Sequence, residues 1–121
     1  MSAPVWLGVA VLGSFGALGR FLLDRAISSR LSVGFPLGTL AVNASGAMLL
    51  GLLTGLALTG DALVLAGSAT LGSYTTFSTW MLETHRLGED GQLNAAAANV
   101  AFSLLLGLAA VALGRLAGGW L

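Results

Sequence analysis

The ten charged side chains of this chain gather at a few positions and leave long intervals with little or no charge between them. Each interval contains a stretch of about 20 apolar residues, and a helix rising about 1.5 Å per residue needs that length to cross ~30 Å of hydrocarbon. The charge pattern therefore predicts a chain whose main solvent is lipid. The intervals are residues 4–23, with Arg20 alone, 31–60 and 62–82, with no charge, and 87–114, with Glu89 and Asp90 near the start.

The four intervals predict an all-α integral membrane protein with a single domain, residues 1–121. Because the connections between the intervals are short, neighbouring helices are expected to run antiparallel and to pack as one four-helix unit. The predicted transmembrane helices cover about residues 4–23, 37–59, 62–82 and 93–115.

Composition excludes several classes of function. Only 8% of the residues are charged and 56% are hydrophobic, whereas soluble proteins carry roughly 25% charged residues. The formal net charge is zero, so no basic surface is available to bind nucleic acid. The chain has no cysteine and a single histidine, His85, which leaves no thiol chemistry and no histidine pair for a metal. With no nucleophile–base pair in the sequence, we predict that the chain is not an enzyme.

Glycine spacing indicates how the helices pack, and the arginines indicate how the chain is oriented in the membrane. Two glycine pairs, at 51 and 55 and at 114 and 118, have the four-residue spacing that lets helices approach closely in lipid, and they favour an oligomer. The arginines give only a weak preference for one membrane orientation, since one side would hold Arg115 and the other Arg20, Arg25, Arg30 and Arg86. A chain with so small a bias is able to insert in either direction.

Polar residues inside the predicted helices share defined faces. Thr39 and Asn43 lie four residues apart in the second helix, and Asn99 and Ser103 have the same spacing in the fourth. A polar group in hydrocarbon is costly unless something satisfies it, so such faces indicate a function or a specific contact.

The third predicted helix contains the densest polar run. Six of the nine residues 72–80 carry hydroxyls, and the run opens on glycine. Glycine, β-branched threonine and serine all weaken a helix, so we predict that this helix is broken near residues 72–75. Non-helical backbone at membrane depth must be buried in protein or line a wet cavity, and its freed carbonyls would suit a cation.

The side-chain donors in these faces carry no charge. Asparagine, serine and threonine donate hydrogen bonds to an anion, and the edge of the Phe77 ring is the positive part of its quadrupole. Glu83 lies just beyond the third helix, and no carboxylate lies deep in a helix, as proton-coupled pumps usually require. The pattern predicts a passive, hydrogen-bonding path for a small anion.

Three ordered motifs resemble those of the Fluc (CrcB) fluoride channel family, and the resemblance covers nearly the whole chain. It implies a dual-topology, antiparallel dimer in a bacterial cell membrane, with two fluoride pores at the subunit interface and a structural Na⁺ at the centre. The motifs are Gly13-Ser-Phe-Gly16-Ala-Leu-Gly-Arg20, then Phe35-Pro-Leu-Gly38-Thr39-Leu-Ala-Val-Asn43-Ala-Ser-Gly46, and Gly72-Ser-Tyr-Thr75-Thr76-Phe77-Ser78-Thr79 followed by Glu83.

The resemblance also implies roles for single residues. Asn43 would hydrogen-bond fluoride, Phe77 would present its ring edge to the ion, and the backbone carbonyls of Gly72 and Thr75 would hold Na⁺. Trp80 stands where similar proteins often carry a second phenylalanine, and its indole edge and N–H are the expected substitutes. The remaining implied residues are Ser103, Thr76 and Thr79 in the pore and Arg20 in the vestibule.

Each role has an alternative that involves no ion. Asn43 could join helices, Phe77 could pack, and Arg20 could extend from a helix end toward the membrane surface. For the whole chain the alternatives are a small four-helix multidrug exporter, which needs a carboxylate in its first helix, and a non-transporting membrane assembly subunit. The sequence also leaves open whether the chain pairs with itself or with a sister subunit.

Overall fold

The computed structural model describes residues 1–31 and 33–121, and every secondary-structure element in these residues is a helix. Three helices are long and apolar enough to cross a membrane: α1 (Ala3–Arg30), α2 (Leu37–Gly55) and α6 (Leu93–Trp120). Helix α1 carries a proline in its first turn, where the missing N–H breaks no helical hydrogen bond. Residue 32, in the predicted link between the first two helices, lies outside the described residues.

The segment between α2 and α6 consists of shorter helical pieces. They are α3 (Gly60–Leu63), the π-helix η1 (Val64–Leu71), α4 (Gly72–Tyr74) and α5 (Ser78–Glu89). Residues 75–77, between α4 and α5, are not helical. The predicted third interval, residues 62–82, falls on this segment.

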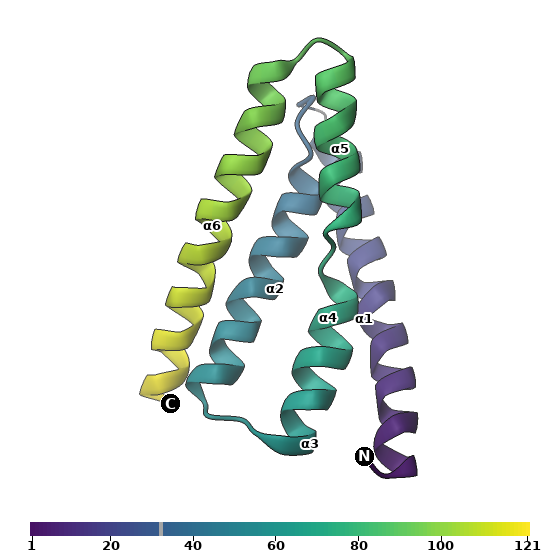
Figure 1. The fold of residues 1–121 in the computed structure, drawn as a ribbon, viewed down its shortest axis with the longest axis vertical. Coiled ribbons are helices and arrows are strands. Elements are labelled where there is room, and N and C mark those ends of the chain that lie inside the picture. The colour runs from purple at the N-terminus through teal and green to yellow at the C-terminus, as the bar shows by residue number, and fades with distance from the viewer. Residues whose placement is uncertain (32) are drawn as a thin grey trace.

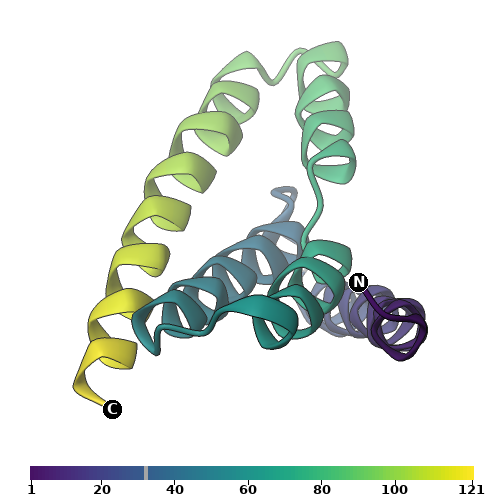
Figure 2. The same ribbon diagram turned by 60° about the horizontal axis from the view of Figure 1, so that its bottom comes forward.

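The chain runs up and down its long axis, so both termini lie at the same end (Figure 1). Ala57 and Gly60, both with φ near +60°, form the turn after α2, and Gly91, with φ of 78°, forms the turn before α6. Figure 2 shows α1, α2 and α4 side by side in one layer, whereas α5 and the first half of α6 stand away from it. The helices differ in their ends from the predicted transmembrane helices 4–23, 37–59 and 93–115: α1 continues to Arg30, α2 stops at Gly55, and α6 reaches Trp120.

Helices α2 and α6 pack closely through the two glycine pairs. A Cβ added at Gly51 would collide with the carbonyl of Val111, and one added at Gly114 would collide with the carbonyl of Met48. Gly55 and Gly118 likewise face the backbone of the opposite helix. The spacing predicts close helix association, and the structure assigns that association to two helices of the same chain, so these pairs do not support an oligomer.

Few side chains are buried inside the single chain. Val42 is fully buried, whereas large apolar side chains along α1 and α6, such as Phe15 and Leu105, are more than 60% exposed. An apolar surface of this extent is unusual for a soluble monomer and fits lipid or another protein chain as its surroundings.

Candidate functional site

The site is built where helical hydrogen bonding stops after α4. Thr75 is the last residue to bond back into the helix, with both its N–H and its hydroxyl donating to the carbonyl of Leu71 at 3.0 Å. Its own backbone is then extended, with φ of −83° and ψ of 163°. The next residue, Thr76, turns its backbone away from the helix, so its N–H and carbonyl need partners from elsewhere.

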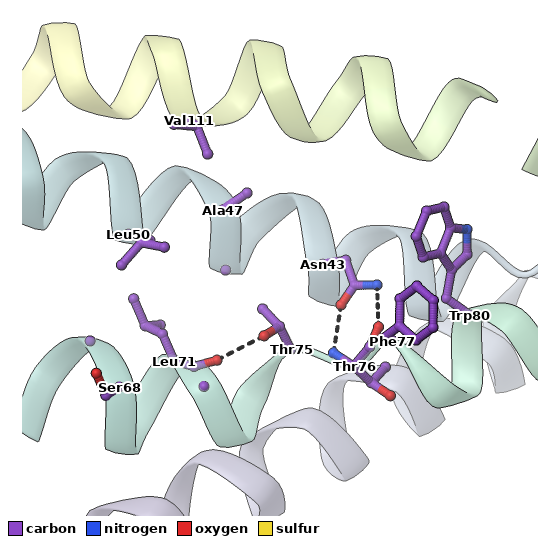
Figure 3. A pocket seen from close by; sticks show the side chains of 13 residues that line it. Asn43, Ala47, Leu50, Ser68, Leu71, Thr75, Thr76, Phe77, Trp80 and Val111 are labelled. Carbon is purple, nitrogen blue, oxygen red and sulfur yellow. Dashed lines mark hydrogen bonds between the residues drawn. The ribbon is translucent and has the colours of Figure 1, made fainter. Parts of the chain in front are cut away.

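Asn43 of α2 supplies both partners. Its amide nitrogen Nδ2 donates to the carbonyl of Thr76, and its Oδ1 accepts from the N–H of Thr76, each at 2.8 Å (Figure 3). A carboxamide carries two N–H donors, and the bond to Thr76 uses one of them. Asn43 therefore stabilises the non-helical backbone and keeps one N–H for another acceptor.

Thr76 also starts the next helix. Its Oγ1 accepts from the backbone N–H of Thr79 at 3.2 Å, in the first turn of α5. A threonine oxygen in this position satisfies one of the N–H groups that have no partner at a helix start. The side chain of Thr76 thus bonds to the first turn of α5, while its backbone N–H and carbonyl bond to Asn43.

Two carbonyls lose their helical donors as a result. In an unbroken α-helix the N–H of Thr76 would bond to the carbonyl of Gly72, and the N–H of Thr79 to that of Thr75. These N–H groups bond instead to the side chains of Asn43 and Thr76. The carbonyls of Gly72 and Thr75, the pair predicted to hold Na⁺, are consequently available as cation ligands, which is the chemistry that a hard cation needs.

A groove of about 500 Å³ brings most of the predicted residues together (Figure 3). The residues Ala47, Leu50 and Val111 give it an apolar wall. It lies open on the surface of the single chain, because Phe77 in its lining is 69% exposed. Six residues predicted for the pore or the cation line this groove: Asn43, Gly72, Thr75, Thr76, Phe77 and Trp80.

The two aromatic rings of the groove contact each other. Phe77 and Trp80 form an edge-on pair, with ring centroids 5.8 Å apart and planes at 84°. The indole N–H of Trp80 donates to the backbone carbonyl of Asn99 in α6, at 3.2 Å. In this structure the N–H of Trp80 is therefore bound within the chain, and the ring alone faces the groove.

Arg20 and Thr79 lie apart from the groove. They line a separate cavity of about 10 Å³ together with Asp24, Thr39 and Thr76, so Thr76 is the residue common to both spaces. Among the residues that the structure describes, no hydrogen-bond partner is found for the buried Nε of Arg20 or the buried Oγ1 of Thr39. A cavity of this size holds about one water-sized species.

Ser103 also lies outside the lining of the groove. Its hydroxyl donates to Oδ1 of Asn99, one turn earlier in α6, at 3.4 Å. The Nδ2 of Asn99 donates in turn to Oγ1 of Thr84 in α5, at 2.8 Å. Sequence reasoning placed Asn99 on a polar face but missed Thr84, which lies on the same face of α5 as Trp80, one turn away.

Comparisons with known proteins find one protein family over most of the chain. A family model described as CrcB-like protein, Camphor Resistance (CrcB), matches residues 7–115. The Fluoride-specific ion channel FluC 2 of Mycolicibacterium paratuberculosis is 59% identical over 114 residues, which cover 94% of this chain and 93% of that protein. FluC 2 of Mycobacterium tuberculosis is 55% identical over 115 residues (95% and 91%), and FluC 1 of Symbiobacterium thermophilum is 45% identical over 121 residues (95% and 97%).

Proposed function

The chain belongs to the CrcB family, and on that premise we propose that it is a passive channel that carries fluoride out of the cell across a bacterial membrane. Relatives that match more than nine-tenths of the chain are named fluoride-specific ion channels, and ion channels are not enzymes. Within the chain, the observation that carries the proposal is the hydrogen-bonded pair of Asn43 and Thr76, which sets an uncharged donor in the lining of a groove.

Fluoride is small and strongly hydrated, so a pore must replace its water with well-placed donors. Asn43 keeps one N–H free of Thr76, and Phe77 presents an exposed ring whose edge is positive. Neither group is charged, so an ion can bind and leave. Selectivity against larger chloride then depends on the width of the path and the placement of these donors.

We propose that α3, η1, α4 and α5 together form a fourth membrane crossing, broken at residues 75–77. With α1, α2 and α6 this gives one four-helix domain. Backbone without helical hydrogen bonds is tolerated at membrane depth only where protein or a wet cavity satisfies it. The bonds from Asn43 to both backbone groups of Thr76 meet that requirement.

A second copy of the chain, inserted in the opposite direction, is the proposed cover of the groove. Asn43, Thr75 and Thr76 line it together with the 69%-exposed Phe77, and polar groups left facing lipid would be costly. An antiparallel homodimer closes two such grooves at one interface and gives two equivalent pores. The weak arginine bias permits both orientations, and a sister subunit would serve equally as the oppositely oriented partner.

We propose that Na⁺ binds at the centre of that dimer. The carbonyls of Gly72 and Thr75 have lost their helical donors and fit a hard cation. When bound, the ion supplies positive potential near the anion path. The chain's own contribution is to hold both carbonyls out of the helix through Asn43 and Thr76.

The remaining residues have proposed roles along the path. Arg20 attracts anions in the vestibule, while Thr79 and Ser103, which lie outside the lining of the groove, supply hydroxyls farther along the path. Outward transport needs no pump, because a membrane potential that is negative inside favours the outward movement of an anion by ~2.3 kcal/mol per 100 mV.

A multidrug exporter is not favoured, because the first helix has no acid before Asp24.

The experiment that tests the proposal is efflux from liposomes reconstituted with this chain alone. Release of fluoride is followed with a fluoride electrode, and the same vesicles loaded with chloride serve as the control for selectivity. Fluoride release without chloride release supports a self-sufficient fluoride channel. Release of neither ion, from protein that remains folded, contradicts a self-sufficient homodimer, and co-expression with a sister subunit then decides between a heterodimer and a non-transporting role.

A further inference from the structure

Asn99 is buried at a place where α6 otherwise faces outward. It is 1% exposed, whereas Phe102 and Leu105 on the same helix are 51% and 67% exposed. A buried carboxamide in apolar surroundings is costly unless its donors and acceptors are paired. The contacts of Asn99 therefore indicate what this residue does.

The hydrogen bonds of Asn99 form a closed circuit between α5 and α6. The indole N–H of Trp80 donates to the Asn99 carbonyl at 3.2 Å, and the Nδ2 of Asn99 donates to Oγ1 of Thr84 at 2.8 Å. The hydroxyl of Thr84 donates back to the carbonyl of Trp80, also at 2.8 Å. Ser103 adds a fourth bond, to Oδ1 of Asn99. The indole of Trp80 is thus bonded directly to α6, whereas its backbone carbonyl is bonded to Thr84 of its own helix, which Asn99 contacts in turn.

Trp80 carries this restraint to the groove. Its ring lies edge-on to that of Phe77, at 5.8 Å between centroids, and both rings line the groove. Phe77 is 69% exposed, so within the single chain the Trp80 ring is a main restraint on where its edge points. In Figure 2, α5 and the first half of α6 stand away from the layer of α1, α2 and α4, and the circuit joins these two helices to each other.

We propose that Asn99 is a positioning residue, which through Thr84 and Trp80 fixes the ring of Phe77 in the path of the anion. The inference rests on the proposed fluoride conduction and names a residue that controls its rate. Asn99 contacts no ion in this role. One N–H of its carboxamide, its Oδ1 and its backbone carbonyl are all engaged in the circuit, and its effect on transport passes through the two aromatic rings.

Matched variants of Thr84 and Asn99 test the inference. Thr84→Val keeps the shape of the side chain and removes two hydrogen bonds, and Asn99→Leu also removes two, whereas Thr84→Ser keeps the hydroxyl. Thr54→Val is the control, because it removes a hydroxyl that bonds only within α2, to the carbonyl of Gly51. Each variant is made in the full chain and in a Trp6→Phe, Trp120→Phe background, in which Trp80 is the remaining tryptophan.

Two readouts separate positioning from folding. In liposome efflux the amplitude counts vesicles that hold working channels, and the rate constant reports conduction by each of them. A hydrogen bond between membrane helices is worth roughly threefold on average, and each of Thr84→Val and Asn99→Leu removes one such bond, from Asn99 to Thr84, so we expect a rate about threefold lower in both variants. Their Trp80 fluorescence should show a lower anisotropy, while Thr84→Ser and Thr54→Val match the parent protein in both readouts.

The outcomes test the positioning role of Asn99 and the proposed channel function separately. Unchanged rate and anisotropy in Thr84→Val and Asn99→Leu overturn the inference, and so does a fall in amplitude alone, since that is a folding effect. If the parent protein releases no fluoride, either alone or with a sister subunit, the proposed function fails. In that case the anisotropy of Trp80 still decides whether Asn99 holds the ring.

Discussion

Replacing Asn43 by aspartate is the sharpest test of how the groove handles an anion. The carboxamide donates to the Thr76 carbonyl and accepts from the Thr76 N–H, both at 2.8 Å. Aspartate keeps the acceptor, removes the donor and adds a negative charge at the same place. The Thr76 carbonyl then loses its partner, and fluoride meets a carboxylate where an N–H stood.

The electrostatic cost of Asn43→Asp exceeds its structural cost. Leaving the Thr76 carbonyl without a partner costs about 1–3 kcal/mol. A unit charge repels another about 4 Å away by about 4 kcal/mol at an effective dielectric constant of about 20. Because about 1.4 kcal/mol corresponds to a factor of ten, conduction should fall about a thousandfold. We therefore expect a protein that folds and does not transport fluoride.

Asn43→Leu is the matched variant, since it loses both hydrogen bonds to Thr76 but adds no charge. Size-exclusion chromatography during heating should show that Asn43→Leu is the less stable protein. Fluoride efflux from liposomes should show that Asn43→Asp is the poorer conductor. Undiminished release from folded Asn43→Asp would refute the role given to Asn43, and equal release from both variants would refute the electrostatic part of the reasoning.

Three further changes test other parts of the structure. Gly114→Ala should lower the free energy of unfolding by about 1–3 kcal/mol, because the added Cβ would collide with the Met48 carbonyl. Gly119→Ala is the control in the same thermal unfolding assay, because a Cβ added there meets nothing within 4 Å. Phe77→Leu keeps an apolar side chain and removes the ring edge, so fluoride efflux should fall while the protein still elutes as the parent does. Purification and efflux in N-methylglucamine in place of sodium should slow fluoride release, and equal rates in both salts would argue against the cation site.

The sequence predicted long apolar helices because hydropathy and length act locally. The ends of those helices were harder to place, since α1 continues through Asp24 and Arg25 to Arg30. Charged residues end the apolar stretch but do not stop helical hydrogen bonding. The glycine spacing correctly indicated close packing, but it does not reveal whether the facing helix belongs to the same chain.

The candidate site depended on contacts that no local pattern encodes. The run of hydroxyl residues indicates that a helix is weak near Thr75, yet Asn43 reaches Thr76 across 33 positions of sequence. Likewise, Thr84 looks like an ordinary helical threonine until Asn99 is seen beside it, 15 positions later. Such pairings depend on how α2, α5 and α6 meet, which only the tertiary structure defines.

One set of hydrogen bonds prepares both proposed ion sites. When Asn43 captures the N–H of Thr76, it frees the carbonyl of Gly72, and when Thr76 caps the N–H of Thr79, it frees the carbonyl of Thr75. The donors for an anion and the acceptors for a cation thus both depend on the three residues of non-helical backbone, 75–77. Because Asn43 is the side chain that holds this backbone, a change there should weaken both sites together. A change at Phe77 should affect the anion path and leave the two carbonyls in place.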